Sequence, residues 1–302
     1  MLFLEIGLKA QSGVYFLSLL FLKDRKKMTN LFEHKTVIIT GASAGVGAAC
    51  ARAFAVQNAK LVLVARGESG LNSIAGELRE HCEVLPVVMD VASSEDCLAL
   101  LEKAETAFGA VHIIINNAGM HSRGDLEKVA PKDVAAMVDI NLRAPLLLSC
   151  AALPYLRRAG SGAIVNIGSL AGRAPLQGAA TYSATKAGLR AFSLALADEL
   201  RDSGIDVGVV SPGPIDTGFI MDEIDAVEDI VFSQPMSSTE QVAEAVLKVA
   251  AGEETEVVLP ASSAKLTHLS YLFPRLRRLL RPSLYAKGRK NKQKYRNRQT
   301  GK

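Results

Sequence analysis

The sequence is poor in aromatic residues, which make up 5% of its 302 positions and include no Trp. It has only four cysteines, and no His stands at zinc-ligand spacing from Cys50, Cys82, Cys97 or Cys150. The wide spacing argues against a disulfide framework or a structural zinc site and predicts reduced thiols. Apolar residues reach 49% and charged residues 22%, which excludes wholesale disorder, collagen and coiled coil. The abundance of Ala, Val, Leu and Gly favours a core of parallel strands.

Negative charge is missing from the C-terminal end, because residues 257–302 contain no Asp or Glu. Thirteen of the 35 Lys and Arg fall there, which leaves 22 against all 31 Asp and Glu in residues 1–256, a net charge of −9. The chain is therefore an acidic body with a basic tail. The overall charge of +4 says little about an active site.

The N-terminal region, residues 1–34, lacks an apolar run long enough to cross a bilayer. Its apolar run, 10–22, has 13 residues, whereas a spanning helix needs about 20. Four bases follow the run, whereas a signal peptide carries its bases before it. Three interpretations stay open: a short membrane-surface anchor, a helix packed on the body, or a true start at Met28.

The C-terminal extension, residues 261–302, begins with apolar residues at helical spacing. Four Arg lie beside this stripe, which comprises Leu266, Leu269, Phe273, Leu276 and Leu280. Such a helix either lies in an anionic membrane surface or packs on the body or a second subunit, although Pro274 interrupts its pattern. Residues 286–302 are polar and basic and are predicted to be disordered. Nucleic-acid binding by this tail is not expected.

Residues 35–260 alternate between short apolar runs and helical patterns. Each run is rich in Val and Ile and apolar on both faces, as in a parallel strand covered by helices on both sides. The alternation predicts a single α/β domain with a doubly wound, seven-stranded parallel sheet. The predicted strands are Thr36–Thr40, Lys60–Ala65, Val84–Val88, Val111–Asn116, Gly162–Gly168, Ile205–Val210 and Glu256–Leu259.

A glycine-rich turn lies between the first strand and a predicted helix. Gly41, Gly45 and Gly47 lack side chains where a pyrophosphate would approach the backbone, and Ser43 and Val46 lie among them. The N-terminus of the helix behind the turn offers unpaired N–H groups and a positive dipole. The strand–turn–helix context indicates a dinucleotide site, although the spacing is G-x-x-x-G-x-G.

With this spacing and the motifs that follow it, the chain resembles a short-chain dehydrogenase/reductase. The resemblance covers residues 35–260 and implies that family's fold, its nicotinamide cofactor and a homodimer or homotetramer. The matching motifs follow in order: Asn116-Asn117-Ala118-Gly119, Asn141, Ser169, Tyr182 with Lys186, and Pro212-Gly213. The resemblance places Asn117, Ala118, Gly119, Pro212 and Gly213 at the cofactor.

The pair Tyr182 and Lys186 is predicted to perform the proton transfer. Their i, i+4 spacing puts both side chains on one helix face. A neighbouring ammonium would lower the pKa of the phenol, so that Tyr182 exchanges a proton with a carbonyl or alcohol oxygen at neutral pH. Ser169 would hydrogen-bond the same oxygen, as a substrate-binding and catalytic group. The resemblance implies that Lys186 also holds the nicotinamide ribose and that Asn141 anchors a water that leads protons to Lys186.

Cofactor choice depends on the end of the second strand. An acidic residue there would accept from the ribose 2′-OH and select NAD, but the sequence has Ala65 and then Arg66. A guanidinium can pair with a 2′-phosphate, with Ser43 adding a hydrogen bond, so NADP(H) is favoured over NAD(H). The resemblance further assigns two pairs to the cofactor: Asp90 and Val91 to the adenine, and Ile215 and Thr217 to the nicotinamide amide.

The segment 214–237 is expected to cover the substrate. It contains ten large apolar side chains and six acids but no Arg or Lys. These features predict an apolar, uncharged carbonyl or alcohol as the substrate, either a small molecule or, given the amphipathic ends of the chain, a lipid-like one.

The sequence therefore predicts a cytoplasmic NADP(H)-dependent oxidoreductase of a carbonyl/alcohol pair, with peripheral membrane contact through the termini left open. Alternatives are an NAD-dependent alcohol dehydrogenase of the same family and a non-catalytic, dinucleotide-binding regulator. The intact Ser169, Tyr182 and Lys186 argue against the regulator.

Overall fold

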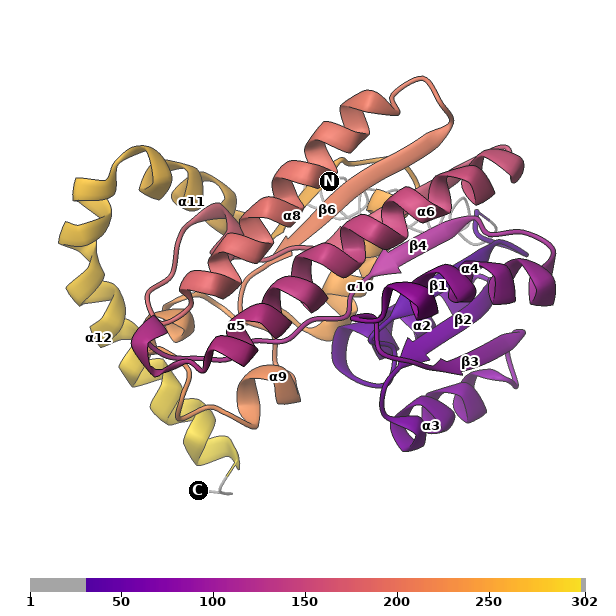
Figure 1. Cartoon of the computed structure of the whole chain (residues 1–302). Helices are drawn as coiled ribbons and strands as arrows, with labels where there is room; N and C mark the ends of the chain where they lie inside the picture. The colour runs from indigo at the N-terminus through magenta and orange to yellow at the C-terminus, as the bar shows by residue number, and fades with distance from the viewer. Residues whose placement is uncertain (1–30, 300–302) are drawn as a thin grey trace, which may run out of the picture.

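The computed structural model describes residues 31–299, and its centre is a seven-stranded parallel sheet with helices on both faces (Figure 1). The interpretations of the N-terminal apolar run and of Met28 lie outside the described residues. The strand order is β3-β2-β1-β4-β5-β6-β7, so the winding reverses between β1 and β4, and the predicted doubly wound fold is confirmed. The strands are β1 (Thr36–Thr40), β2 (Lys60–Ala65), β3 (Val84–Val88), β4 (Ile113–Asn116), β5 (Gly162–Ile167), β6 (Ile205–Pro212) and β7 (Glu256–Leu259).

Helices follow nearly every strand, and three short helical turns join them. The helices are α2 (Gly45–Ala55), α3 (Glu68–Leu78), α4 (Ser94–Phe108), α5 (Pro131–Val138), α6 (Ala144–Arg158), α7 (Leu170–Arg173), α8 (Ala180–Glu199), α9 (Gly218–Met221), α10 (Thr239–Ala250), α11 (Ser262–Leu272) and α12 (Pro274–Gln299). The turns are η1 (Leu126–Lys128), η2 (Asp139–Arg143) and η3 (Asp229–Ser233); η2 is a π-helical turn.

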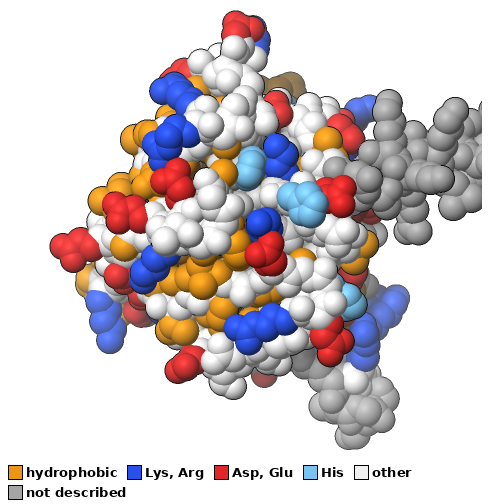
Figure 2. All heavy atoms as spheres, turned by 90° about the vertical axis from the view of Figure 1, so that its right-hand side faces the viewer, with side chains coloured by type: hydrophobic (Ala, Val, Ile, Leu, Met, Phe, Trp, Pro, Cys, Tyr) orange, Lys and Arg blue, Asp and Glu red, His pale blue; other side chains and the backbone are white. Residues whose placement is uncertain are grey.

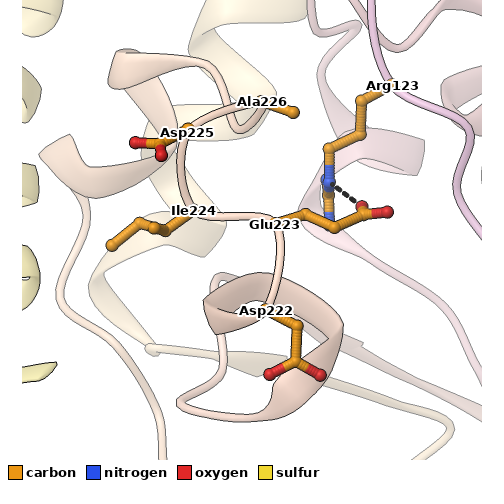
Figure 3. Close-up of a pocket in the computed structure, with 6 residues that line it drawn as sticks. All are labelled: Arg123, Asp222, Glu223, Ile224, Asp225 and Ala226. Atoms are coloured by element: carbon orange, nitrogen blue, oxygen red, sulfur yellow. Dashed lines mark hydrogen bonds and ion pairs between the residues drawn. The ribbon is translucent and has the colours of Figure 1, made fainter.

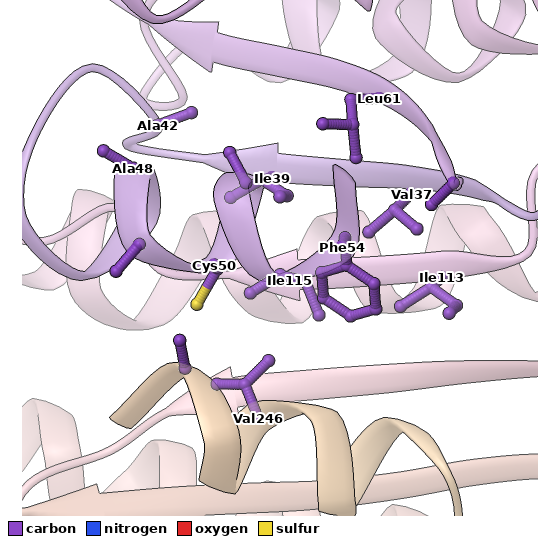
Figure 4. Close-up of a cluster of buried hydrophobic side chains, with 14 of the residues drawn as sticks. Val37, Ile39, Ala42, Ala48, Cys50, Phe54, Leu61, Ile113, Ile115 and Val246 are labelled. Carbon is purple, nitrogen blue, oxygen red and sulfur yellow. The ribbon is translucent and has the colours of Figure 1, made fainter. Parts of the chain in front are cut away.

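The sheet separates two apolar cores, because successive side chains of a strand point to opposite faces. Val37 and Ile39 of β1 pack with α2, α3 and α10, whereas Ile38 packs with α4, α6 and α8. Figure 4 shows the first core, where Phe54 and Cys50 of α2 lie between the sheet and Val246 of α10. Burial raises the pKa of the Cys50 thiol to about 12, and all four cysteines are free.

Local signals explain where two of these helices begin. Ser238 and Gln241 form a capping box at the start of α10, with Ser238 Oγ accepting from the Gln241 N–H at 3.2 Å. Ser93 caps α4 in the same way, accepting from the Asp96 N–H. Such caps satisfy N–H groups that the helix itself leaves unpaired.

The continuous helix over 131–158 comprises α5, η2 and α6. By length and composition it is the one helix among residues 31–299 that could span a membrane. Its apolar residues Leu148, Ala152 and Leu156 are buried in the second core, beside α4. Packing inside the fold therefore accounts for part of its apolar composition.

The C-terminal extension differs from expectation. The prediction that residues 286–302 are disordered is wrong as far as Gln299, because α12 continues to that residue. Acidic residues of the body order it: Asp229 pairs with Lys292 at 3.3 Å and with Arg289 at 3.2 Å. The predicted apolar stripe is also interrupted, since α11 ends at Leu272 and α12 begins at Pro274, where a first-turn proline is tolerated.

Candidate active site

The carboxyl ends of β1, β4, β5 and β6 open into one cavity of about 780 Å³. It lies where the strand order reverses, the usual place for ligands in a doubly wound sheet. Among the predicted site residues, Gly47 and Asn141 do not line it. Those that do are Gly41, Ser43, Gly45, Val46, Arg66, Asp90, Val91, Asn117, Ala118, Gly119, Ser169, Tyr182, Lys186, Pro212, Gly213, Ile215 and Thr217.

The glycine turn after β1 forms one end of the cavity. Gly41 and Gly45 have φ of +67° and +54°, a region that favours glycine. Gly47 lies under the turn, where a Cβ atom would be 2.1 Å from the Gly41 carbonyl oxygen. No side chain caps the start of α2, and its first turn holds no acid. Bare backbone at an uncapped helix N-terminus fits a pyrophosphate.

The ends of β1 and β4 are fastened together beneath this turn. Thr40 Oγ1 accepts from the N–H groups of Asn117 and Ala118, both at 3.0 Å. The Asn117 amide in turn donates to the carbonyl oxygens of Thr40 and Gly41, at 2.9 and 3.1 Å. Asn117 therefore shapes the glycine turn from behind.

A base and an acid face each other at the end of β2 and after β3. Arg66 Nη1 lies 3.8 Å from Asp90 Oδ2, and 69% of the Arg66 side chain is exposed. Asp90 Oδ1 accepts from the Ala92 N–H at 2.9 Å, so its carboxylate also shapes the following turn. Arg66 lines the cavity, and the nearby Asp90 carboxylate offsets part of its charge.

Tyr182 and Lys186 extend from α8 toward the ends of β5 and β6. The buried Lys186 Nζ donates to the Ile167 carbonyl at 2.7 Å and lies 5.9 Å from the centre of the Tyr182 ring. Ser169 follows β5 and caps α7, with its Oγ accepting from the Ala171 N–H. The three side chains predicted to carry chemistry thus meet in one cavity.

The pKa values at this end are set mainly by burial. Burial raises the pKa of Tyr182, while the hydrogen bond with Ser169 and the charge of Arg123 oppose that rise. Burial also lowers the pKa of Lys186 to about 8. We predicted that the Lys186 ammonium lowers the phenol pKa; in the structure the net shift is upward, since desolvation disfavours the phenolate.

Asn141 lies in the π-helical turn η2 and is completely buried. Its Oδ1 accepts from the Met120 N–H and its Nδ2 donates to the Met120 carbonyl, both at 2.8 Å. The amide thus fixes the loop that follows Gly119. Its predicted link to Lys186 through a water stays a prediction.

His121 is a site residue that the sequence analysis does not select. Its ring stacks on Tyr182, with centroids 4.3 Å apart and planes inclined by 13°. Arg123 Nη1 lies 2.8 Å from His121 Nδ1. A guanidinium only donates, so Nδ1 accepts and Nε2 carries the proton. Burial and the charge of Arg123 lower the pKa of His121 to about 3, so the ring is neutral.

The remaining atom of that ring, Nε2, is buried and has no hydrogen-bond partner within residues 31–299. His121 lines the cavity beside Tyr182, so this N–H is a free donor near the reacting group. Its position two residues after the Asn116-Asn117-Ala118-Gly119 motif is the signal in the sequence that points to it.

Arg123 connects this loop to the segment that covers the substrate. Its Nε donates to Glu223 Oε2 at 3.0 Å and its Nη2 to the Phe219 carbonyl at 2.6 Å. Figure 3 shows the Arg123–Glu223 pair beside a shallow hollow of about 330 Å³, whose other lining residues come from the acidic turn 222–226. The segment 214–237 has no base of its own, and Arg123 supplies one from the loop after β4.

The outer wall of the cavity comes from the C-terminal extension. Side chains of α11 and α12 line it: Leu266, Thr267, Ser270, Arg277, Leu280 and Leu284. The sequence analysis does not place the extension at the site. Within the described part of the chain, no three His, Cys, Asp or Glu side chains gather closely enough to hold a metal ion.

Comparison with known proteins points to one family. A profile of the short chain dehydrogenase family matches residues 35–228. Ketoacyl reductase HetN from Nostoc sp. is 35% identical over 228 residues, which cover 74% of this chain and 78% of that protein.

Two solved structures have the same fold. The 3-ketoacyl-(acyl-carrier-protein) reductase from Brucella melitensis, complexed with NADH, superposes with a TM-score of 0.69 and 28% identity over 76% of this chain and 97% of its own. An actinorhodin polyketide ketoreductase with NADPH superposes with a TM-score of 0.69 and 29% identity over 74% of this chain and 95% of its own.

Proposed function

The chain belongs to the short-chain dehydrogenase family of NAD(P)-dependent oxidoreductases, and we propose that it uses NADP(H) to interconvert a ketone and an alcohol on an apolar substrate. The observation that carries the proposal is a single cavity with a glycine turn at one end and Ser169, Tyr182 and Lys186 at the other. The family acts on CH–OH groups, and the proposal is supported by a cavity that would hold the nucleotide beside a proton donor.

The turn Gly41–Gly47 and the start of α2 would hold the pyrophosphate of the dinucleotide. Ile215 and Thr217 would contact its nicotinamide end, and the backbone of Thr217 is fixed by its own N–H bond to Ile215. When bound, the nicotinamide supplies or accepts the hydride. The protein's part is to orient that ring and to manage the proton.

Tyr182 is the proposed general acid and base. Its hydroxyl gives a proton to the carbonyl oxygen during reduction and takes one from the alcohol during oxidation. Ser169 donates a hydrogen bond to the same oxygen as charge develops there. Lys186, with a pKa of about 8, is cationic at neutral pH and favours the phenolate that is left after the proton moves.

Preference for NADP(H) rests on Arg66 and on the absence of an acid at the end of β2, where Ala65 stands. The two solved relatives were determined with NADH and with NADPH, so the fold accepts both nucleotides. We expect Arg66→Ala to reduce kcat/KM for NADPH about tenfold and to leave NADH unchanged, because a charge-assisted hydrogen bond to a 2′-phosphate is lost. Arg79→Ala, an exposed base at the end of α3, is the matched control.

A ketone on an acyl chain is the substrate class that the relatives support, since they are named as ketoacyl and polyketide ketoreductases. The substrate end of the cavity is consistent with such a chain. Leu176, Phe219, Ile230 and Val231 line it together with the leucines of the extension.

The decisive assay is a panel of ketones and alcohols, each with NADPH/NADP⁺ and NADH/NAD⁺, followed at the nicotinamide absorbance. We expect Tyr182→Phe to lower kcat at least about a hundredfold, since a positioned acid or base contributes that much, while nucleotide affinity is retained. Tyr155→Phe on α6 is the control and should keep full activity. Undiminished turnover by Tyr182→Phe would contradict the mechanism, and nucleotide binding without any turnover would favour a regulator.

We further propose that residues 35–260 form the catalytic domain of a cytoplasmic homodimer or homotetramer. The family resemblance supports the assembly. Light scattering on the purified full chain would measure its mass, and a monomer at assay concentration would contradict the proposal.

A further inference from the structure

The first half of the extension carries an unusual density of exposed apolar side chains. Every residue from Tyr271 to Leu280 is exposed except the half-buried Arg277, and the exposed fractions of Leu272 and Leu279 reach 69% and 77%. These side chains form a surface that we call the C-terminal patch, which comprises Leu266, Leu269, Tyr271, Leu272, Phe273, Leu276, Leu279 and Leu280. A contiguous apolar surface of this kind marks an interaction site.

Within residues 266–281, which carry the C-terminal patch, there are four Arg and no Asp or Glu. Arg275, Arg277 and Arg278 form no ion pair with any described residue, and Arg281 contacts only the hydroxyl of Tyr285 among side chains. In the second half of α12 four bases pair with acids of the body instead, as Lys292 does with Asp229. Elsewhere the surface mixes both signs: Figure 2 shows basic and acidic side chains interspersed on the face at the right of Figure 1.

The C-terminal patch is continuous with the active-site cavity. Leu266 of α11 and Leu280 of α12 are each 41% exposed and also line the cavity. Figure 1 shows α11 and the start of α12 at the outer edge of the molecule, beyond the helices that cover the sheet. The cavity therefore opens onto this exposed apolar surface.

We propose that the C-terminal patch docks on an anionic lipid bilayer, and that an apolar substrate passes from the bilayer to Tyr182 between α11 and α12. The second half of this inference rests on the proposed function. Leucine and aromatic side chains entering the acyl boundary, with Arg at the headgroups, are the recognised form of interfacial helix binding. Each base near an anionic surface adds about 1 kcal/mol.

A second copy of the chain fits the same surface less well. In a two-fold symmetric dimer the patch would meet itself. Four Arg would then face four Arg, with no acid between residues 257 and 302 to offset them. Like charges brought together across an interface disfavour such a pairing.

The test is cosedimentation of the full chain with vesicles of phosphatidylcholine alone or mixed with phosphatidylserine. We expect binding to the mixed vesicles and at least a tenfold loss of affinity in Arg275→Glu with Arg278→Glu. Lys290→Glu with Lys294→Glu makes the same charge change in the second half of α12 and should keep most of the binding. Leu272→Glu with Leu279→Glu tests the apolar part in the same way, and none of these residues lines the cavity.

Turnover separates the two parts of the inference. We expect the Arg275 and Arg278 variant to retain kcat/KM on a water-soluble ketone and to lose at least fivefold on a ketone dissolved in the mixed vesicles. Equal vesicle binding by the wild type and by both patch variants would overturn the proposal. A change from dimer to monomer in the patch variants would also overturn it, because the patch would then be a contact between subunits. If no ketone is turned over by wild type, the proposed function fails while the vesicle result still decides docking.

Discussion

The nucleotide end and the substrate end of this cavity are built in opposite ways. At the nucleotide end the wall is backbone, formed by turns directly after β1 and β4 and fastened by Thr40 and Asn117. At the substrate end the wall comes from segments far apart in the chain, such as Arg123 and Glu223, which are separated by 100 residues. The form of the first end is set by the backbone of its turns. The form of the second end is set by ion pairs between distant segments.

This difference indicates which end can vary. A glycine turn tolerates almost no added atom, because the backbone itself closes over it. Exposed ion pairs each contribute little and can be exchanged one at a time. We therefore expect the wall at the substrate end of the cavity to tolerate substitutions, whereas the glycine turn at the nucleotide end does not.

Gly47→Ala is expected to have the largest effect and would test the rigidity of the nucleotide end. The added Cβ would lie 2.1 Å from the Gly41 oxygen, so the turn must move, and we expect NADPH affinity to fall more than about thirtyfold, equivalent to about 2 kcal/mol. Isothermal titration calorimetry measures this affinity.

Its control is Gly76→Ala in α3, where a Cβ would meet nothing within 4 Å. That variant should bind NADPH normally and be slightly more stable, since alanine is the better helix former. Normal NADPH binding by Gly47→Ala would show that the glycine turn can accommodate a side chain and is not rigid.

Gly288→Ala tests the substrate end. Its Cβ would lie 1.8 Å from the Asp229 carbonyl oxygen, where α12 crosses η3. We expect α12 to shift away from the body and the substrate KM to rise about tenfold, roughly the 1–3 kcal/mol of an overpacked contact, with nucleotide affinity unchanged. Lys287→Ala, exposed on the same helix, should leave both constants as in wild type. A matching loss of nucleotide affinity would mean that the two ends are not independent.

His121→Phe removes the Nε2 N–H, and with it the Nδ1 acceptor of Arg123, while keeping a ring to stack on Tyr182. We expect kcat/KM to fall about five- to tenfold for a substrate that accepts from Nε2, the value of one neutral hydrogen bond of about 1 kcal/mol. Steady-state kinetics measures it, and the exposed His81→Phe is the control. Unchanged kinetics would place His121 outside the substrate contacts.

The smallest expected effect is a pH dependence of stability that comes from Glu256, which joins β7 to the C-terminal extension through Arg173. Burial raises the pKa of Glu256, but hydrogen bonds from Arg190 and Arg173 outweigh it and lower the pKa to about 2. Arg173 also donates to Thr267 of α11, so this cluster ties the extension to β7. The stabilisation by Glu256 is present above its ordinary pKa of 4.5 and is lost as the pH falls toward 2.

Thermal unfolding at successive pH values checks this. We expect Glu256→Gln to be less stable than wild type at neutral pH, and the difference to shrink as acid protonates Glu256. Glu254→Gln, an exposed neighbour, should follow the wild-type curve throughout. If the difference in stability between Glu256→Gln and the wild type does not change with pH, protonation of Glu256 does not affect stability.

The glycine turn and the Tyr182–Lys186 pair could be predicted from the sequence, because the parts of each lie close together in the chain. Gly41 to Gly47 follow a strand and open a helix within seven residues, and Tyr182 and Lys186 share a helix turn. The substrate wall was not readable. His121 and Arg123 acquire their roles from a stacking contact with Tyr182 and a pair with Glu223, and neither contact has a local pattern.

The order of α12 shows the same limit. Taken alone, residues 286–299 are too polar and basic to bury an apolar face, and composition predicts disorder. The acids that order them, Asp225 and Asp229, lie about sixty to seventy residues earlier in the chain.

By itself the amino-acid sequence determined the parallel sheet, its winding and the glycine turn, and it indicated the candidate reacting side chains, since periodicity and short spacings encode these directly. Only the tertiary structure decided which distant charges meet and how deeply Tyr182 and Lys186 are buried. It also decided which wall closes the cavity. Desolvation and long-range pairing depend on everything that surrounds a group, and no local stretch of sequence contains that information.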